Sequence, residues 1–74
     1  MSALDRQTGG SHYKDMKIQP AEFINTNNIP YLEGRAIAYL CRWREKNGIE
    51  DLRKAIHCIE LKIDLETREW NQSI

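Results

Sequence analysis

The apolar residues between positions 49 and 63 recur at alternating intervals of three and four, and an Asn-Gly pair stands directly before them. They are Ile49, Leu52, Ile56, Ile59 and Ile63. This spacing places all of them on one face of an α-helix and does not fit the period of two that a β-strand requires. Asn47-Gly48 tolerates the left-handed backbone conformation that ends many helices. The sequence therefore predicts an all-α fold with a helix from about Ile49 to Trp70.

Two shorter helices are predicted before the Asn-Gly pair. The first begins at Pro20, because proline is favoured at the first position of a helix, and stops in the polar cluster 25–28. The second begins at Pro30 and runs to about Lys46. Since the turn after it is short, we expect the second and third helices to pack antiparallel as a hairpin. The expected organisation is a flexible N-terminal arm over 1–11, a single helical domain over 12–70 and a C-terminal tail over 71–74.

The third helix carries a second apolar patch, more than a quarter-turn away from the first, which is formed by Cys58, Leu61 and Leu65. A chain of 74 residues has a thin core, because it buries only about 60% of its unfolded surface. One hairpin and a two-turn helix are too small to cover both apolar faces, and a bare second face is prone to association. We therefore expect a homo-oligomer in which the third helix takes part in the contact.

The charge balance excludes some classes of partner. Eleven basic and eleven acidic residues give no net charge, whereas a general DNA or RNA binder relies on a basic surplus to replace phosphate counterions. We expect no nucleic-acid partner, but small anions need only local positive charge. No apolar run is long enough to span a membrane, and the N-terminus lacks the apolar middle of a signal peptide. The predicted location is the cytoplasm, where thiols are reduced.

The residues that bind metals or act as nucleophiles form no recognisable motif. The available zinc ligands are His12, His57, Cys41 and Cys58. They lack C-x-x-C or H-x-x-x-H spacing, so we expect no metal, no cofactor and two cysteines that serve as small buried residues. Glu60 and Asp64 lie on one helical face, either as a magnesium site that shares a phosphate ligand or as a solvated stripe. No P-loop is present.

Two segments combine basic and aromatic side chains. A short polar segment contains Gly9-Gly10-Ser11-His12-Tyr13-Lys14, and the second helix places Arg35, Tyr39, Arg42 and Lys46 within one arc. Guanidinium and ammonium groups bind phosphate, while tyrosine or histidine can stack on a base. This combination favours an anionic ligand with a flat ring, such as a nucleotide. The alternative is a solvated helix face beside a flexible arm.

The motifs that carry a family resemblance are His-Tyr-Lys at 12–14, Pro20, the helical segment 34–42 and the segment 49–56. In these the chain resembles the SaV-like bacteriophage family, a domain of unknown function also found in phage proteins described as nucleotide kinases. The resemblance implies a phage origin and the host cytoplasm as the site of action. The positions that match the family pattern are His12, Tyr13, Lys14, Pro20, Gly34, Tyr39, Arg42, Asp51, Leu52, Lys54 and Ala55. Arg35 and Ala38 depart from the pattern, so the basic group has moved around the helix.

Residues and resemblance together lead to one preferred hypothesis and two alternatives. The preferred one is a phage protein that binds a nucleotide or nucleotide-derived ligand without turnover, and so sequesters a host immune signal or modulates a nucleotide pool. The predicted ligand-binding residues are His12, Tyr13, Lys14, Arg35, Tyr39, Arg42 and Lys54, with no catalytic residue. The alternatives are a nucleoside monophosphate kinase without a P-loop and a module that docks its third helix on a host protein without any ligand.

Overall fold

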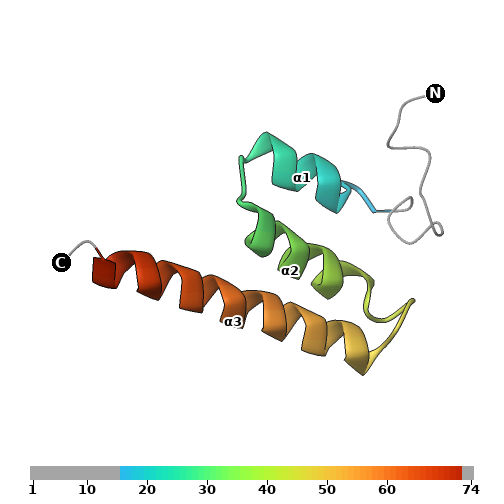
Figure 1. Ribbon diagram of the computed structural model, residues 1–74. Helices are drawn as coiled ribbons and strands as arrows, with labels where there is room; N and C mark the ends of the chain where they lie inside the picture. Colours follow the sequence, from blue (N-terminus) through green and yellow to red (C-terminus); the bar gives the residue numbers. More distant parts are fainter. Residues whose placement is uncertain (1–15, 73–74) are drawn as a thin grey trace.

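The computed structural model of the chain describes the backbone of residues 16–72 and the side chains of residues 16–68 (Figure 1). It contains α1 (Pro20–Thr26), α2 (Tyr31–Arg42) and α3 (Ile49–Gln72), and the described part holds no strand. The predicted all-α class is therefore confirmed. The predicted arm over 1–11 lies outside the described residues. None of the described helices is long and apolar enough to cross a membrane.

Helix α1 begins with Pro20 in its first turn, as predicted. It ends in a Schellman motif, in which the Asn28 N–H donates to the Asn25 carbonyl at 3.2 Å and the Ile29 N–H donates to the Ile24 carbonyl at 3.0 Å. This motif needs a left-handed residue after the helix, and Asn28 has a φ of 54°. Asparagine adopts that conformation more readily than most residues, so the asparagine cluster stops the helix.

Glycine at position 34 allows α1 to approach α2 closely. Gly34 is buried in α2, and a Cβ added there would lie 2.9 Å from Cγ2 of Ile24 on α1. Glycine inside a helix costs about 0.5–1 kcal/mol relative to alanine. The close packing of Ile24 on the α2 backbone explains why the fold uses glycine at this position.

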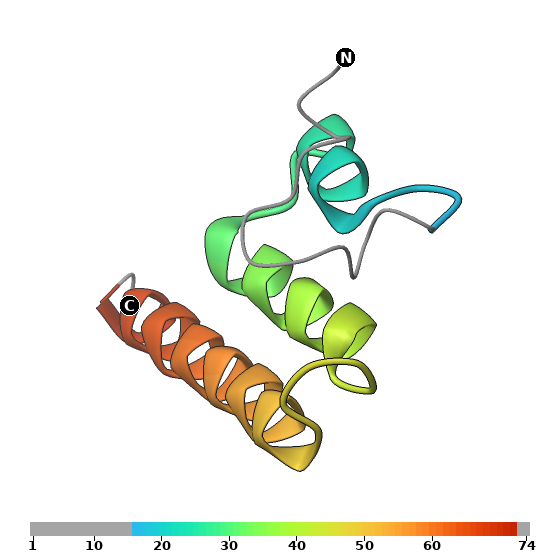
Figure 2. The same ribbon diagram turned by 90° about the vertical axis from the view of Figure 1, so that its right-hand side faces the viewer.

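Helices α2 and α3 lie side by side in both views (Figures 1 and 2). The core between them consists of small side chains, Ala36 from α2 and Ala55 and Cys58 from α3. Leu32 and Tyr39 of α2 pack against this core at its edges. Small residues at the contact let the two helix backbones come close together.

The structure corrects the predicted packing of α3. The sequence predicts that the apolar stripe of α3, here called the isoleucine seam, forms the main packing face, and that the second patch stays uncovered by the hairpin. The seam consists of Ile49, Leu52, Ile56, Ile59 and Ile63, and the second patch of Cys58, Leu61 and Leu65. Of that patch only Cys58 is buried, together with Ala55 and Asp51, while Leu61 and Leu65 stay exposed. Ile56 and Ile59 of the seam are also exposed. The reason is that the carboxylate of Asp51 is bound by Arg42 at the end of α2 and by Asn47 in the turn, so the face that holds Asp51 turns towards α2. The seam therefore points away from the core.

The segment between α2 and α3 is longer than predicted. Helix α2 ends at Arg42, so Lys46 lies in the turn over 43–48 and not on the helix. Gly48 has a φ of 61°, and its N–H donates to the Trp43 carbonyl at 2.8 Å. Gly48 therefore adopts the left-handed conformation that the Asn-Gly pair indicated, but it lies directly before α3 and does not end α2, which stops at Arg42.

The two cysteines are free thiols. Cys58 is buried, as predicted, whereas Cys41 is only partly buried. Burial raises the pKa of the Cys41 thiol.

Candidate functional site

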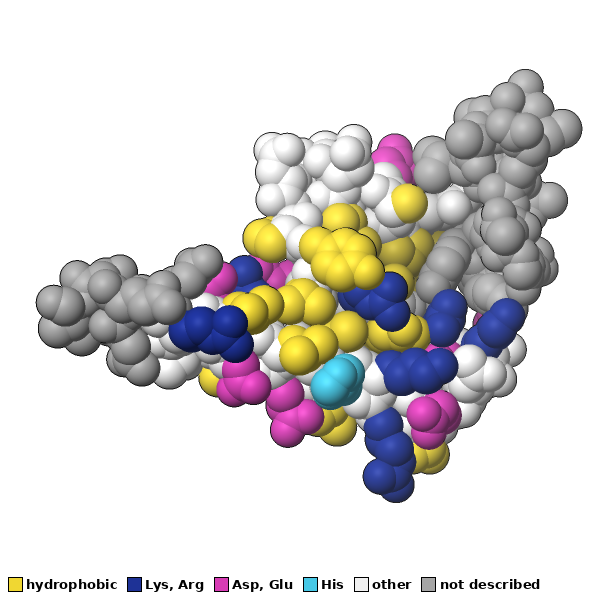
Figure 3. All heavy atoms as spheres, in the orientation of Figure 1, with side chains coloured by type: hydrophobic (Ala, Val, Ile, Leu, Met, Phe, Trp, Pro, Cys, Tyr) yellow, Lys and Arg dark blue, Asp and Glu magenta, His cyan; other side chains and the backbone are white. Residues whose placement is uncertain are grey.

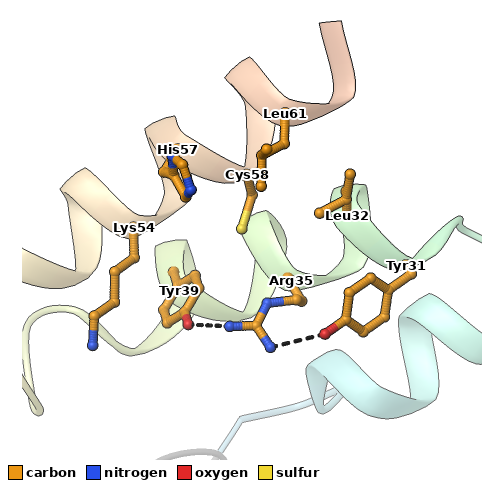
Figure 4. A pocket seen from close by; sticks show the side chains of 8 residues that line it. All are labelled: Tyr31, Leu32, Arg35, Tyr39, Lys54, His57, Cys58 and Leu61. Carbon is orange, nitrogen blue, oxygen red and sulfur yellow. Dashed lines mark hydrogen bonds between the residues drawn. The ribbon is translucent and has the colours of Figure 1, made fainter. Parts of the chain in front are cut away.

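A groove of about 500 Å³ opens between α2 and α3 (Figure 4). Its volume lies within the range of small-molecule sites, roughly 300–1,000 Å³. The lining residues are Tyr31, Leu32, Arg35 and Tyr39 from α2, and Lys54, His57, Cys58 and Leu61 from α3. We call this site the α2–α3 groove. Figure 3 shows basic side chains and a histidine next to an apolar patch on the same face of the molecule.

Arg35 is held between two tyrosines of its own helix. Its Nη1 donates to the Tyr31 hydroxyl at 3.0 Å, and its Nη2 donates to the Tyr39 hydroxyl at 2.5 Å. Both tyrosines lie four residues from Arg35, which places all three side chains on one face of α2. Hydrogen bonding to Tyr31 is the main cause that raises the pKa of Arg35. The guanidinium is therefore both charged and fixed in position.

The ring of Tyr39 is surrounded by three cationic side chains. The guanidinium carbons of Arg42 and Arg35 lie 4.7 Å and 5.4 Å from the ring centroid, and Nζ of Lys54 lies 5.9 Å from it. Each distance is within the range of cation–π attraction. Positive charge from both helices is therefore gathered around the ring of Tyr39, which lines the groove.

Arg42 is bound to a buried carboxylate. The side chain of Asp51 has no exposed surface, and the Arg42 guanidinium donates to both of its oxygens at 3.3 Å. Asn47 adds its backbone N–H at 3.3 Å and its side-chain amide at 3.2 Å. Burial raises the pKa of Asp51, but the hydrogen bonds from Arg42 and Asn47 outweigh it and lower the pKa. Asp51 is therefore an ionised anchor of the α2–α3 turn.

The positive charge of the α2–α3 groove is not neutralised by acidic residues in the described part of the chain. The ion pairs there join Arg42 to Asp51 and Lys62 to Glu33 and Glu66. Arg35 and Lys54 have no such carboxylate partner among the residues that the structure describes.

The predicted ligand-binding residues divide into three groups. Arg35, Tyr39 and Lys54 line one groove, although Lys54 comes from a different helix. The guanidinium of Arg42 lies over the ring of Tyr39 but donates hydrogen bonds to Asp51. The predicted residues His12, Tyr13 and Lys14 lie outside the described residues.

Sequence reasoning did not assign several groove residues to a site. These are Tyr31, Leu32, His57, Cys58 and Leu61. Tyr31 has the same spacing to Arg35 as Tyr39 does, so the helical period could have identified it. His57 follows Lys54 by about one turn, but this becomes informative only once the face of α3 that meets α2 is known.

No group of three or more histidine, cysteine or acidic side chains gathers to hold a metal ion in the described part of the chain.

Residues 7–60 match a family described as a protein of unknown function, DUF3310. The match covers all of the groove residues except Leu61. No curated protein and no solved structure matches the chain.

Proposed function

The chain belongs to the DUF3310 family, and we propose that it binds a small anionic ligand that carries a flat ring, of the nucleotide class, in the α2–α3 groove. The observation that carries this proposal is the fixed guanidinium of Arg35 beside the ammonium of Lys54, without an acidic partner among the described residues. We also propose that α2 and α3 act as an antiparallel hairpin that holds the two walls of the site.

Arg35 and Lys54 are the phosphate-binding groups in this proposal. Arg35 uses two of its donors on the tyrosine hydroxyls and also interacts with the Cys58 thiol. A guanidinium has five N–H donors, so donors remain for a ligand. The hydroxyls of Tyr31 and Tyr39 accept from Arg35, so their own protons can be donated to phosphate oxygens. Arg35, Tyr31 and Tyr39 thus offer hydrogen-bond donors around the positive charge of the guanidinium. This arrangement favours phosphate over a neutral ligand.

The remaining wall of the α2–α3 groove suits a planar ring. Leu32 and Leu61 supply apolar contact, and His57 offers an imidazole that can stack or form a hydrogen bond. Tyr39 presents its ring close to the cations. A mononucleotide has both a phosphate for Arg35 and a flat base for this wall.

The biological setting of the proposal rests on the resemblance to the SaV-like phage family. We propose that the protein acts in the cytoplasm of an infected host, where it sequesters a nucleotide-derived immune signal or modulates a nucleotide pool. Binding without turnover is the preferred form, because the groove holds positioned cations but no residue that we assign as catalytic. Phosphoryl transfer, and binding to a host protein in place of a ligand, are the alternatives.

Calorimetric titration tests the proposal. Adenosine monophosphate, adenosine triphosphate, adenosine and inorganic phosphate are titrated separately into the full-length protein. We expect both nucleotides to bind more tightly than adenosine or phosphate alone, because only they occupy the cation cluster and the apolar wall together. Loss of one charge-assisted contact, in Arg35→Ala or Lys54→Ala, weakens nucleotide binding roughly tenfold or more.

Arg44→Ala is the matched control. Arg44 is an exposed arginine whose guanidinium lies 4.8 Å from the Trp43 ring, and it does not line the groove. Equal affinity of wild type, Arg35→Ala and Arg44→Ala for both nucleotides would overturn the assignment of the site. Mass spectrometry of the titrated nucleotides separates binding from turnover, because transferred phosphate would support the kinase alternative.

A further inference from the structure

Four of the five residues of the isoleucine seam of α3 are about half exposed in the described part of the chain, whereas Leu52 is partly buried. Ile49, Ile56, Ile59 and Ile63 are 58%, 56%, 48% and 58% exposed. Helix α2 packs against the face of α3 that holds Ala55 and Cys58. A stripe of large apolar side chains with this exposure is unusual on a protein surface unless it is an interaction site.

We propose that the seam pairs with the same seam of a second copy of this chain, as an antiparallel coiled coil. The alternating three- and four-residue spacing is that of the a and d positions of a heptad, with Ile49, Ile56 and Ile63 at a and with Leu52 and Ile59 at d. Helix α3 has 24 residues and a length of about 36 Å, which gives the seam room for several layers of contact. This contact is separate from the α2–α3 groove.

The charged residues beside the seam favour a second copy of this chain as the partner and an antiparallel orientation of the two α3 helices. Arg53 and Glu60 are exposed and occupy successive e positions of the heptad. When two α3 helices run antiparallel, e positions face e positions, so Arg53 of each copy meets Glu60 of the other. A parallel pair would instead place Arg53 opposite a g position, where the chain has Gly48 or Ala55 and no charge.

Glu66 supports the same direction. It follows Ile63 by three residues and continues the seam at a d position. In a parallel pair the two Glu66 carboxylates, each paired with Lys62 of its own chain at 2.7 Å, would face each other across the seam at a d position, where apolar residues are preferred. In the antiparallel pair Ile56 packs on Ile59 of the second copy, and each Glu66 lies at an end of the contact beside Ile49, where water reaches it.

Helix α2 leaves the seam accessible and adds apolar surface next to it. The Lys62–Glu33 ion pair, 3.5 Å long, marks the edge of α2 that lies nearest the seam. Leu40 follows Glu33 by about two helical turns, so it lies along the same edge, and it is 48% exposed. A second α3 on the seam would therefore also cover Leu40.

The first test measures the mass of the full-length protein in solution by light scattering at tens of micromolar. We expect a mass of about twice the 8.7 kDa of one chain. Ile59→Glu should reduce the mass to that of a monomer and leave the helix content in circular dichroism unchanged, because Ile59 is outside the core. Leu61→Glu is the matched control on the groove side of α3 and should stay dimeric.

The second test exchanges the charges of Arg53 and Glu60, which are exposed, so its outcome does not depend on the burial of these side chains. Arg53→Glu and Glu60→Arg should each weaken the dimer at least several-fold in its dissociation constant, because each creates two like-charge contacts at e positions beside the seam. The double variant, and a mixture of the two single variants, should recover the affinity of wild type. A monomeric or larger wild-type assembly, a dimer lost in Leu61→Glu but kept in Ile59→Glu, or absence of charge rescue would overturn the proposal.

Discussion

Arg42 and Asp51 face each other across the turn that joins α2 to α3, with the guanidinium on both oxygens of a carboxylate that has no exposed surface. Arg42 also lies 4.7 Å from the centroid of the Tyr39 ring. The pair therefore connects the turn between the helices to the ring that gathers the cations of the α2–α3 groove. It acts on the site by holding Tyr39 and α3 in place, while its own charges neutralise each other.

Removing one partner of this pair should destabilise the fold. Arg42→Ala leaves a buried, charged carboxylate with only the Asn47 donors. Asp51→Asn differs from it, because it keeps the shape of the side chain but removes the buried charge. We expect Arg42→Ala to lower the urea midpoint most among single arginine-to-alanine variants, and Arg44→Ala to leave it unchanged. A silent Arg42→Ala would show that Asp51 does not depend on this contact.

Asp51 should also make stability depend on pH in the acidic range. Its pKa is lower in the folded chain than in the unfolded chain, so the unfolded state binds more protons as the pH falls. The stabilisation is complete above the ordinary pKa of aspartate, about 3.9, and is lost as the pH falls through the lower folded value. Urea midpoints measured from pH 6 downwards should fall less steeply in Asp51→Asn than in wild type.

Gly34→Ala should destabilise the protein although alanine favours helices. The gain in helix propensity is about 1 kcal/mol, whereas a methyl group 2.9 Å from Ile24 Cγ2 overpacks the α1–α2 contact at a cost of about 1–3 kcal/mol. Chemical denaturation measures the difference. In an Ile24→Ala background the clash is absent, so Gly34→Ala should become neutral or stabilising there. The same loss in both backgrounds would contradict this explanation.

Gly48→Ala isolates the cost of backbone conformation. No atom lies within 4 Å of the added Cβ, but the φ of 61° belongs to the left-handed region. We expect a loss of roughly 1–2 kcal/mol in the free energy of unfolding, and a smaller loss for Gly48→Asn. Equal stability of the alanine variant and wild type would mean that the turn adopts another conformation.

The fold class and the approximate helix positions were predictable, because the features that set them act locally. These features are Pro20 at a helix start, Gly48 in a turn and the helical spacing of the isoleucines. The face of α3 that packs was not predictable in this way. Isoleucines give a stronger hydrophobic signal than Ala55 or Cys58, yet the position of α2 is set by small residues that permit close contact and by Asp51. Burial of Asp51 depends on Arg42 and Asn47, which reach it only after the turn has formed.

The candidate site was predictable to the extent that it lies on one helix. Arg35 and Tyr39 share a face of α2, and the spacing alone brings them together. Lys54 came from the family resemblance, and His57 was missed because its neighbours belong to the other helix. Arg42 has the right charge and spacing, but its donors are taken by Asp51, a contact nine residues away that no helical period indicates.

The final prediction separates the two tyrosines that hold Arg35. Tyr39→Phe removes one hydroxyl that accepts from Arg35 and can donate to a phosphate, but it keeps the ring that contacts three cations. If the hydroxyl serves the ligand, nucleotide affinity should fall about threefold to tenfold, in line with one hydrogen bond of roughly 0.5–1.5 kcal/mol, while the urea midpoint stays near wild type. Tyr39→Leu should also lower stability, because the cation–π contacts disappear with the ring.

In the Arg35→Ala background Tyr39→Phe should have a smaller effect on affinity, since the hydroxyl is no longer oriented by the guanidinium. Independent, additive losses in that double-mutant cycle would show that Tyr39 and Arg35 do not act as one phosphate-binding unit.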